Sequence, residues 1–297
     1  GGEGNARRQN QLEFVVLLFG LTPSGLWNWL EEHNVSTLTP MGIKENIAFE
    51  HLEGRGIEFG ALTNLLPVNK DRAEVVYADR LSRSESIVLF PELGDVAESI
   101  VEPDLIIDFN DAVALRSLAS ENFDFLIANH FIEHLANPIQ FLVGCSEILK
   151  SGGMLFLTVP DKDRTFDKNR KLTSNHHLWR DFKRGESTIS NSHLREFLKS
   201  LPLHTPPDSV IHYFKENNLP LEYYDDMKLP LNPFKRQRLF NWHRERSIHV
   251  HVWNRESFDG FLNWIIAKLE LGLEIKPTHS PEDVEGEMIY VLNKMSN

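Results

Sequence analysis

The chain has 297 residues, of which 41% are hydrophobic and 25% are charged. These values are typical of a globular protein that buries a full core, as one large α/β domain with an insertion or as two small domains. The formal net charge of −12 argues against nucleic acid as the main partner. The single cysteine, Cys145, excludes an intrachain disulfide and fits a reducing, cytoplasmic compartment.

The N-terminal part contains the most apolar window of the chain, Leu12 to Leu21. This window falls far short of the roughly 20 residues that span a bilayer, so we expect no transmembrane segment. We interpret it as a packed extension; the alternatives are an interface with a neighbouring domain or protein through residues 11–30 and a targeting remnant. A short helix is predicted from Ser24 to about His33. The start at Gly1, without a methionine, indicates a processed form or an excised domain.

Two predicted strands carry acids at positions that suit a nucleoside. The first contains Glu58 and breaks at Gly60, and the second, residues 74–78, is followed by Asp79. In open α/β sheets, ligands lie outside the carboxyl ends of the strands. A glycine there lets the backbone approach a ligand closely, and an acid can accept hydrogen bonds from two ribose hydroxyls. These residues indicate half of a nucleoside site, and they leave open which nucleoside is bound.

The connection between these two strands is close to the minimum for a parallel crossover, so the first helix is expected to be short or irregular. The elements predicted after it follow from hydrophobic periodicity and capping residues. They are a strand at Asp104–Ile107 ending at Asp108-Phe109, a helix at Ala112–Ala119, a strand at Phe125–Ala128, a helix at Pro138–Lys150, a strand at Met154–Val159, a helix from Glu256 to about Leu269, and late strands at Leu273–Ile275 and Glu287–Leu292.

Residues 161–247 differ from the rest of the chain. Hydrophobic periodicity weakens there, and the segment carries seventeen Lys and Arg against twelve Asp and Glu, although the whole chain is acidic. A basic insertion on an acidic scaffold favours either a solvated helical surface or a lid that attracts an anionic acceptor. The positive side chains Arg164 and Arg170 follow the fifth predicted strand closely, and arginine can bind phosphate or carboxylate with two hydrogen bonds.

Four motifs together resemble a known family. They are GIEFG, VVYAD, FDFLIANHFIEHLANP and GGMLFLTVPD, and in this order they are similar to the class I S-adenosylmethionine-dependent methyltransferases. The resemblance runs from about Gly54 to Pro160 and resumes near Ile248. It is closest to small-molecule methyltransferases of bacteria, a subgroup often associated with polysaccharide assembly. It implies S-adenosylmethionine as the cofactor and a methyltransferase activity.

The resemblance also implies the architecture. We expect a Rossmann-like, doubly wound and mostly parallel sheet with one late antiparallel strand, plus an irregular helical insertion after the fifth strand. The domain division expected from it is an N-terminal extension (1–47), a cofactor-binding core (48–160), a basic insertion that serves as acceptor lid (161–247) and a C-terminal completion of the core (248–297).

Carried over residue by residue, the resemblance implies the following cofactor-binding residues. Glu58 and Gly60, with the adjoining Phe59 and Ala61, would face the methionine end of the cofactor. Asp79 would bind the ribose, with Arg80 beside the adenine, and Asp108 and Phe109 would contact the adenine edge and face. Asn129 and His130 would line the methionine or acceptor side.

The residue that takes the proton of an alcohol acceptor is left open among several candidates. His134 lies just past the fourth predicted strand and has a suitable intrinsic pKa. Asp161 directly follows the fifth strand. Further candidates are His177, its neighbour His176, and His251. The remaining alternative is a mechanism without a dedicated base. The pairs His176-His177 and His249-x-His251 lack a third ligand at recognisable spacing, so we expect no metal site.

The most specific function that these features predict is O-methylation of a sugar hydroxyl on an anionic saccharide, such as a sugar nucleotide, a glycan terminus or a lipid-linked saccharide. One alternative is a nicotinamide-dependent oxidoreductase, but GIEFGALTN lacks the G-x-G-x-x-G pattern that holds a pyrophosphate. The other is a non-catalytic methyltransferase-like module of a larger glycan-assembly protein.

Overall fold

The computed structural model of the chain describes residues 42–90, 97–200, 231–276 and 286–296. The apolar window Leu12–Leu21 and the helix predicted from Ser24 lie outside these residues. Within them, no helix combines the length and the apolar character needed to cross a membrane.

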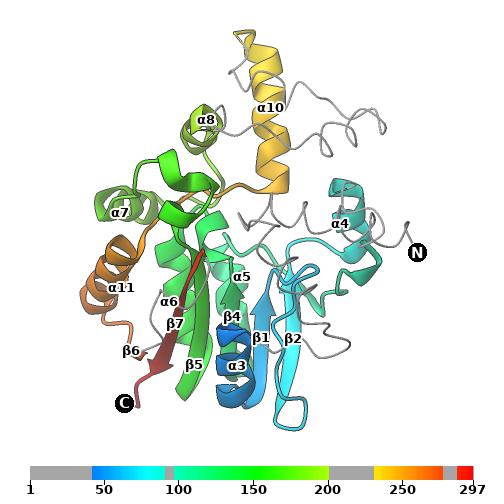
Figure 1. The fold of residues 1–297 in the computed structure, drawn as a ribbon, viewed down its shortest axis with the longest axis vertical. Coiled ribbons are helices and arrows are strands. Elements are labelled where there is room, and N and C mark those ends of the chain that lie inside the picture. The colour runs from blue at the N-terminus through cyan, green and yellow to red at the C-terminus, as the bar shows by residue number, and fades with distance from the viewer. Residues whose placement is uncertain (1–41, 91–96, 201–230, 277–285, 297) are drawn as a thin grey trace, which may run out of the picture.

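The core is one seven-stranded sheet in the order β3-β2-β1-β4-β5-β7-β6. Its strands are β1 (Gly54–Phe59), β2 (Ala73–Asp79), β3 (Leu105–Ile106), β4 (Phe123–Asn129), β5 (Leu149–Pro160), β6 (Leu273–Lys276) and β7 (Glu287–Lys294). Strand β7 is antiparallel to both of its neighbours, whereas the other pairs are parallel. In Figure 1 it points away from the end toward which β1 and β4 run. The expected mostly parallel sheet with one late antiparallel strand is confirmed, and the position of β7 distinguishes it from the all-parallel 3-2-1-4-5-6 sheet of dinucleotide-binding proteins.

Helices cover both faces of the sheet (Figure 1). They are α3 (Ile43–His51), α4 (Arg83–Leu89), α5 (Ala112–Arg116), α6 (Pro138–Ile148), α7 (Asn175–Arg184), α8 (Asn191–Ser200), α10 (Pro233–Arg246) and α11 (Arg255–Leu269). Helix α3 packs on one face through Ile47, Ala48 and Leu52. Helices α6 and α11 pack on the other face, where the largest cluster of buried side chains lies. Because α3 spans the expected boundary at residue 47, the structured core begins by Ile43.

Two local features differ from a regular α/β alternation. No helix connects β1 to β2, so the irregular first crossover expected from its length is confirmed. The predicted helix at Ala112–Ala119 is divided into α5 and a 3₁₀ helix at Ser117–Glu121, and β5 begins at Leu149, earlier than predicted. The early part of β5 includes Gly152 with φ of +79°, a conformation that the sequence pattern does not reveal.

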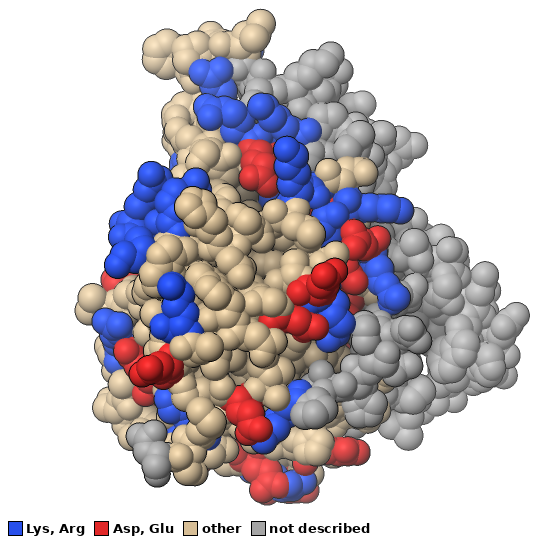
Figure 2. Space-filling view, turned by 90° about the vertical axis from the view of Figure 1, so that its left-hand side faces the viewer, with Lys and Arg blue, Asp and Glu red and all other residues tan. Residues whose placement is uncertain are grey.

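The insertion builds a small hydrophobic core of its own beyond the carboxyl ends of the parallel strands. Side chains of α8 and α10 meet those of the segment after α10 in this second core, whose buried members are Ile189, Leu194, Phe197, Leu198, Leu239, Phe240, Ile248 and Val250. In Figure 1, α8 and α10 rise from that end of the sheet. Figure 2 shows lysines and arginines gathered on the same part of the molecule.

Trp253 joins the insertion to the sheet and is expected to be important for stability. Its side chain is fully buried, and its ring stacks on Phe261 at 5.8 Å and meets Phe258 edge-on at 5.1 Å. Trp253→Ala should lower the free energy of unfolding by about 3–5 kcal/mol, because it leaves a cavity in the core. Urea denaturation would measure this loss. Trp253→Phe is the control, since it keeps an aromatic ring and leaves a smaller cavity, so its loss of stability should be clearly smaller. Equal losses for both variants would contradict this account.

Candidate active site

A cavity of about 660 Å³ lies at the carboxyl edge of the sheet, between the core and the insertion. Its volume is in the range of small-molecule and cofactor sites. Eight of the ten residues predicted to bind the cofactor line this cavity: Gly60, Ala61, Asp79, Arg80, Asp108, Phe109, Asn129 and His130. The carboxyl ends of β1, β2 and β4 therefore converge on one space, as the strand-end argument requires.

Asp79 at the end of β2 presents a carboxylate to the cavity. Its Oδ1 accepts hydrogen bonds from the backbone N–H groups of Arg80, at 2.6 Å, and Leu81, at 3.4 Å. These bonds fix the side chain in place and involve only one of its two oxygens. Burial raises the pKa of Asp79, and the two N–H groups and the charge of Arg80 oppose that rise. A ligand that donates two hydroxyl hydrogens would compensate this carboxylate for the water that burial removes.

Asp108 and Phe109, after β3, lie on the cavity beside Asp79. Asp108 Oδ1 accepts the backbone N–H of Asn110 at 3.0 Å, which holds the loop. The ring of Phe109 is buried and packs edge-on against Phe59 at 5.5 Å and against Phe131 at 4.9 Å. A carboxylate beside a fixed aromatic ring can contact the edge and the face of a flat base.

Glu58 and Phe59 lie behind the cavity and do not line it. Glu58 is completely buried, and its Oε1 accepts the backbone N–H of Leu66 at 3.0 Å. Burial raises the pKa of Glu58 to about 8. Because side chains alternate along a strand, Phe59 points to the opposite face, where it packs in the main core. Glu58 therefore positions the segment Gly60–Leu66, which does line the cavity.

Gly60 has a backbone reason to be glycine. Its backbone φ is +64°, a value that residues with a side chain rarely adopt. A Cβ at this position would lie 2.9 Å from the Phe131 ring. A substitution at Gly60 would therefore strain the backbone even with the cavity empty of any ligand.

A hydrogen-bonded group at one side of the cavity includes two residues that the sequence reasoning missed. His130 Nε2 lies 2.6 Å from Glu287 Oε2, and Lys44 Nζ donates to the same oxygen at 3.0 Å. Burial alone would raise the pKa of Glu287, but His130 and Lys44 hold it below its usual value. Glu287 was predictable in principle, since the antiparallel strand β7 begins at the edge where the parallel strands end. Lys44 was assigned to the extension.

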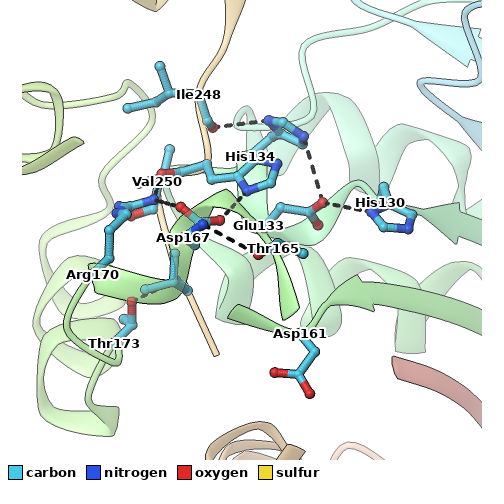
Figure 3. Close-up of polar contacts among 12 residues, drawn as sticks. His130, Glu133, His134, Asp161, Thr165, Asp167, Arg170, Thr173, Ile248 and Val250 are labelled. Carbon is cyan, nitrogen blue, oxygen red and sulfur yellow. Dashed lines mark hydrogen bonds and ion pairs between the residues drawn. The ribbon is translucent and has the colours of Figure 1, made fainter. Parts of the chain in front are cut away.

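The candidate bases are dispersed, and of these only His134 lines the cavity. Asp161 caps a 3₁₀ helix by accepting the N–H of Asp163 at 3.0 Å, and Figure 3 shows it apart from the group around His134. His176 is exposed, His177 faces α8, and His251 is fully buried. Asp161, His177 and His251 are therefore not placed to take a proton in the cavity.

His134 is held in one orientation and one protonation state. Its Nδ1 lies 3.0 Å from the carbonyl oxygen of Ile248, to which it must donate, and 3.2 Å from Ser247 Oγ. Nε2 therefore carries the lone pair. Burial, followed by the charge of His249, lowers the pKa of His134 to about 3, although about 30% of the side chain stays exposed. The ring is thus neutral at physiological pH and can accept a proton at Nε2.

The carboxylate of Glu133 lies in a buried group of histidines (Figure 3). Its Oε1 is 3.7 Å from His130 Nδ1 and 3.7 Å from His134 Nε2. His249 Nδ1 contacts Asp167 Oδ2 at 2.5 Å, and its ring meets that of His134 edge-on at 4.8 Å. Glu133, His134 and His249 offer ligand atoms within 4.8 Å of one another, so this set could hold a cation. The expectation that no metal is bound stays a prediction.

Positive charge reaches the cavity from a different part of the insertion than expected. Arg170 is buried in an ion pair with Asp167 at 2.9 Å, and neither it nor Arg164 lines the cavity. Arg244 and Arg246, at the end of α10, line it instead. Arg170 therefore serves packing, and whether the insertion holds an anionic acceptor stays a prediction.

The comparisons with known proteins identify the family. A family model described as a methyltransferase domain matches residues 42–263, so the chain belongs to this methyltransferase domain family. The sheet order and the match confirm the resemblance to class I methyltransferases, whose cofactor is S-adenosylmethionine.

Curated relatives match over a shorter region. The ubiquinone biosynthesis O-methyltransferase of Cereibacter sphaeroides is 30% identical over 120 residues, which cover 39% of this chain and 44% of that protein. The match thus spans less than half the length of the relative.

Solved structures match over more of the chain with low similarity. One is an S-adenosylmethionine-dependent methyltransferase of Thermotoga maritima, described as a possible histamine N-methyltransferase (13% identity, TM-score 0.36, 91% of this chain and 95% of that one). Another is an O-methyltransferase family protein of Burkholderia thailandensis (10% identity, TM-score 0.38, 86% and 54%).

Asp79 should carry much of the cofactor affinity. Asp79→Asn keeps an oxygen for the two backbone N–H groups but removes the charge. Losing charge-assisted hydrogen bonds, worth about 1.5–3 kcal/mol each, should weaken binding of S-adenosylmethionine about tenfold or more. Isothermal titration calorimetry measures the effect. Glu74→Gln, the same change at the exposed start of β2, is the control. Unchanged affinity in a folded Asp79→Asn variant would remove Asp79 from the cofactor site.

Proposed function

We propose that this protein transfers a methyl group from S-adenosylmethionine to a hydroxyl oxygen of an acceptor that carries a negative charge, with His134 as the proton acceptor. The observation that carries the proposal is that His134 lines the same cavity as Asp79, Asp108 and Gly60, with its Nε2 lone pair available. The match to a methyltransferase domain and the O-methyltransferase names of the curated relatives support it.

The cavity residues fit the proposed cofactor. Asp79 would hold the ribose hydroxyls, and Asp108 with Phe109 would contact the adenine. No helix follows β1, so the cavity lacks the helix N-terminus that favours a bound pyrophosphate. Its absence suits a cofactor whose reactive centre is a cationic sulfonium, and it disfavours the oxidoreductase alternative.

A weak base is sufficient for this reaction. When bound, S-adenosylmethionine would supply a methyl carbon: the acceptor oxygen would form its bond to carbon as the carbon–sulfur bond breaks and its electron pair stays on sulfur. That oxygen gains positive charge as the bond forms, so its proton becomes strongly acidic. The neutral imidazole of His134 can then take the proton at Nε2 despite its low pKa. The Nδ1 contact with Ile248 keeps Nε2 directed away from that carbonyl.

The acceptor is proposed to be an anionic saccharide, methylated at a sugar hydroxyl. Arg244 and Arg246 on the insertion side of the cavity support a negative group on the acceptor. The likeness to methyltransferases of polysaccharide assembly favours a sugar nucleotide, a glycan terminus or a lipid-linked saccharide. This role makes residues 161–247 the acceptor lid.

A phenolic acceptor is the second candidate. The curated relatives are named for ubiquinone biosynthesis, and the leucines of the segment Gly60–Leu66 give the cavity an apolar side. Assays with a panel of sugar nucleotides and hydroxylated aromatic acids, using purified protein and labelled cofactor, would separate the two. Methylation of neither class in protein that binds the cofactor would favour the non-catalytic alternative.

His134→Asn should lower kcat about 10²–10⁴-fold, because it removes the proton acceptor while keeping a donor near the Ile248 carbonyl. Cofactor affinity should not change. His176→Asn, the same substitution at an exposed position, is the control. An unchanged kcat in the His134 variant would show that the reaction needs no base at this position.

The pH profile provides a second check on His134. Its lowered pKa means that it stays neutral well below pH 6.5, so its protonation should not reduce kcat/KM until the pH approaches about 3. A decline centred near pH 6.5 that disappears in His134→Asn would mean that the ring titrates like an exposed histidine.

Arg246→Gln should raise the KM for an anionic acceptor about tenfold, since a charge-assisted hydrogen bond contributes about 1.5–3 kcal/mol. The effect should shrink at high salt, and cofactor affinity should hold. Arg238→Gln, an exposed position on the same helix, is the control for charge alone. Equal KM changes in both variants would mean that general surface charge, and not a direct contact of Arg246 with the acceptor, causes the effect.

A further inference from the structure

Three side chains outside the cavity meet between α7 and α8, which follow each other along the insertion. His177 and Asp181 are one turn apart on α7, so they share a face, and His193 reaches them from α8. His177 Nε2 lies 2.8 Å from His193 Nε2 and 2.8 Å from Asp181 Oδ2. His193 Nε2 lies 3.3 Å from the same oxygen. Three potential ligand atoms thus converge on one point.

Protons cannot satisfy all three contacts together. If one of the two Nε2 atoms carries hydrogen, the other Nε2 turns a lone pair toward Asp181 Oδ2. If both carry hydrogen, the two N–H groups face each other across 2.8 Å. A cation placed among the three atoms satisfies all of them, because each directs a lone pair inward.

The cluster is buried on most sides. The side chains of Asp181 and His193 are each 3% exposed, and that of His177 is 24% exposed. Beside them lies the fully buried His251, with its ring centroid 5.6 Å from that of His177 and 5.5 Å from that of His193. Neither nitrogen of His251 completes a hydrogen bond of normal geometry within the described residues, although the backbone of Ala136 favours its charged form. A buried carboxylate beside three imidazoles is an environment suited to a metal.

We propose that His177, Asp181 and His193 bind a divalent transition-metal ion, with Zn²⁺ as the best-suited ion. Zinc accepts imidazole and carboxylate ligands, and ligand atoms around one tetrahedral Zn²⁺ at about 2.0–2.1 Å lie about 3.3 Å apart. The separations of 2.8, 2.8 and 3.3 Å need only a small expansion to reach that geometry. Water completes the coordination on the exposed side of His177.

The ion would hold the wall of the cavity. Leu178 of α7 packs in the main core, whereas Leu194 of α8 packs in the small core of the insertion. The loop between these helices contains Ser187, Thr188 and Ile189, which line the cavity. A metal bridging α7 to α8 fixes the two ends of this loop. The metal site itself does not depend on the proposed reaction. The expectation that the metal-held loop helps to bind the acceptor does rest on the proposed function.

The test is zinc binding by the purified, folded chain. Chelator-treated protein is titrated with Zn²⁺ in a calorimeter, and Co²⁺ replaces it to report the coordination by visible absorption. We expect the wild type and His176→Gln, which changes an exposed neighbour, to bind the ion here. His193→Gln and Asp181→Asn should each lose about one ion per chain and the tetrahedral Co²⁺ spectrum.

A separate variant distinguishes this site from the group at the cavity. Glu133→Gln should not affect the ion between α7 and α8. If zinc binding is lost only in Glu133→Gln, or if the folded wild type binds no zinc, the proposal is wrong. If His193→Gln and Asp181→Asn fail to fold, the titration of Glu133→Gln decides: retained zinc binding and a tetrahedral Co²⁺ spectrum support the site between α7 and α8, and their loss overturns it.

Kinetics test the effect on the wall. Removing zinc should raise the acceptor KM several-fold and leave the affinity for S-adenosylmethionine unchanged. An unchanged KM in metal-free protein would overturn the role in the wall. If no acceptor is methylated at all, the proposed function fails, but the number of zinc ions bound per chain still tests the metal site.

Discussion

The hydrogen bond from the Leu66 N–H to the Glu58 carboxyl group fixes a crossover that contains no helix. Between β1 and β2 the chain forms no helix, so the backbone groups of this crossover need other partners. Glu58 supplies one of them from inside the sheet, at 3.0 Å. Burial raises its pKa to about 8, so the group is mostly protonated at neutral pH and avoids the cost of a buried charge. The position of Gly60–Leu66, and hence one wall of the cavity, depends on this contact.

The sequence predicted those features that follow from strand direction. Asp79 and Asp108 reach one cavity because the parallel strands β2 and β3 end at the same edge. It could not show which face of β1 the crossover covers, so Glu58 was expected at the ligand. Arg170 was expected to bind an anionic acceptor. Its burial against Asp167 depends on the distant carbonyls of His249 and Val250, which the local pattern around Arg170 does not reveal.

Contacts between separate elements explain the remaining differences. His177 lacked a recognisable third ligand because His193 comes from the next helix, and Asp181, one turn on from His177, was not considered as a ligand. Lys44 and Glu287 meet at the cavity although almost the whole chain separates them. Buried polar groups of this kind stay hydrogen-bonded or paired, and their partners are set by packing that local patterns do not encode.

The second hydrophobic core in the insertion has a consequence for how this protein can change. Because α8 and α10 bury their apolar side chains mainly against each other and residues 248–250, substitutions among them leave the packing of the sheet untouched. A unit with its own core can also open and close by itself, at a lower free energy than global unfolding. If this unit holds the acceptor as proposed, mutations in it would affect the cofactor side little, and new acceptors could be acquired without a new fold.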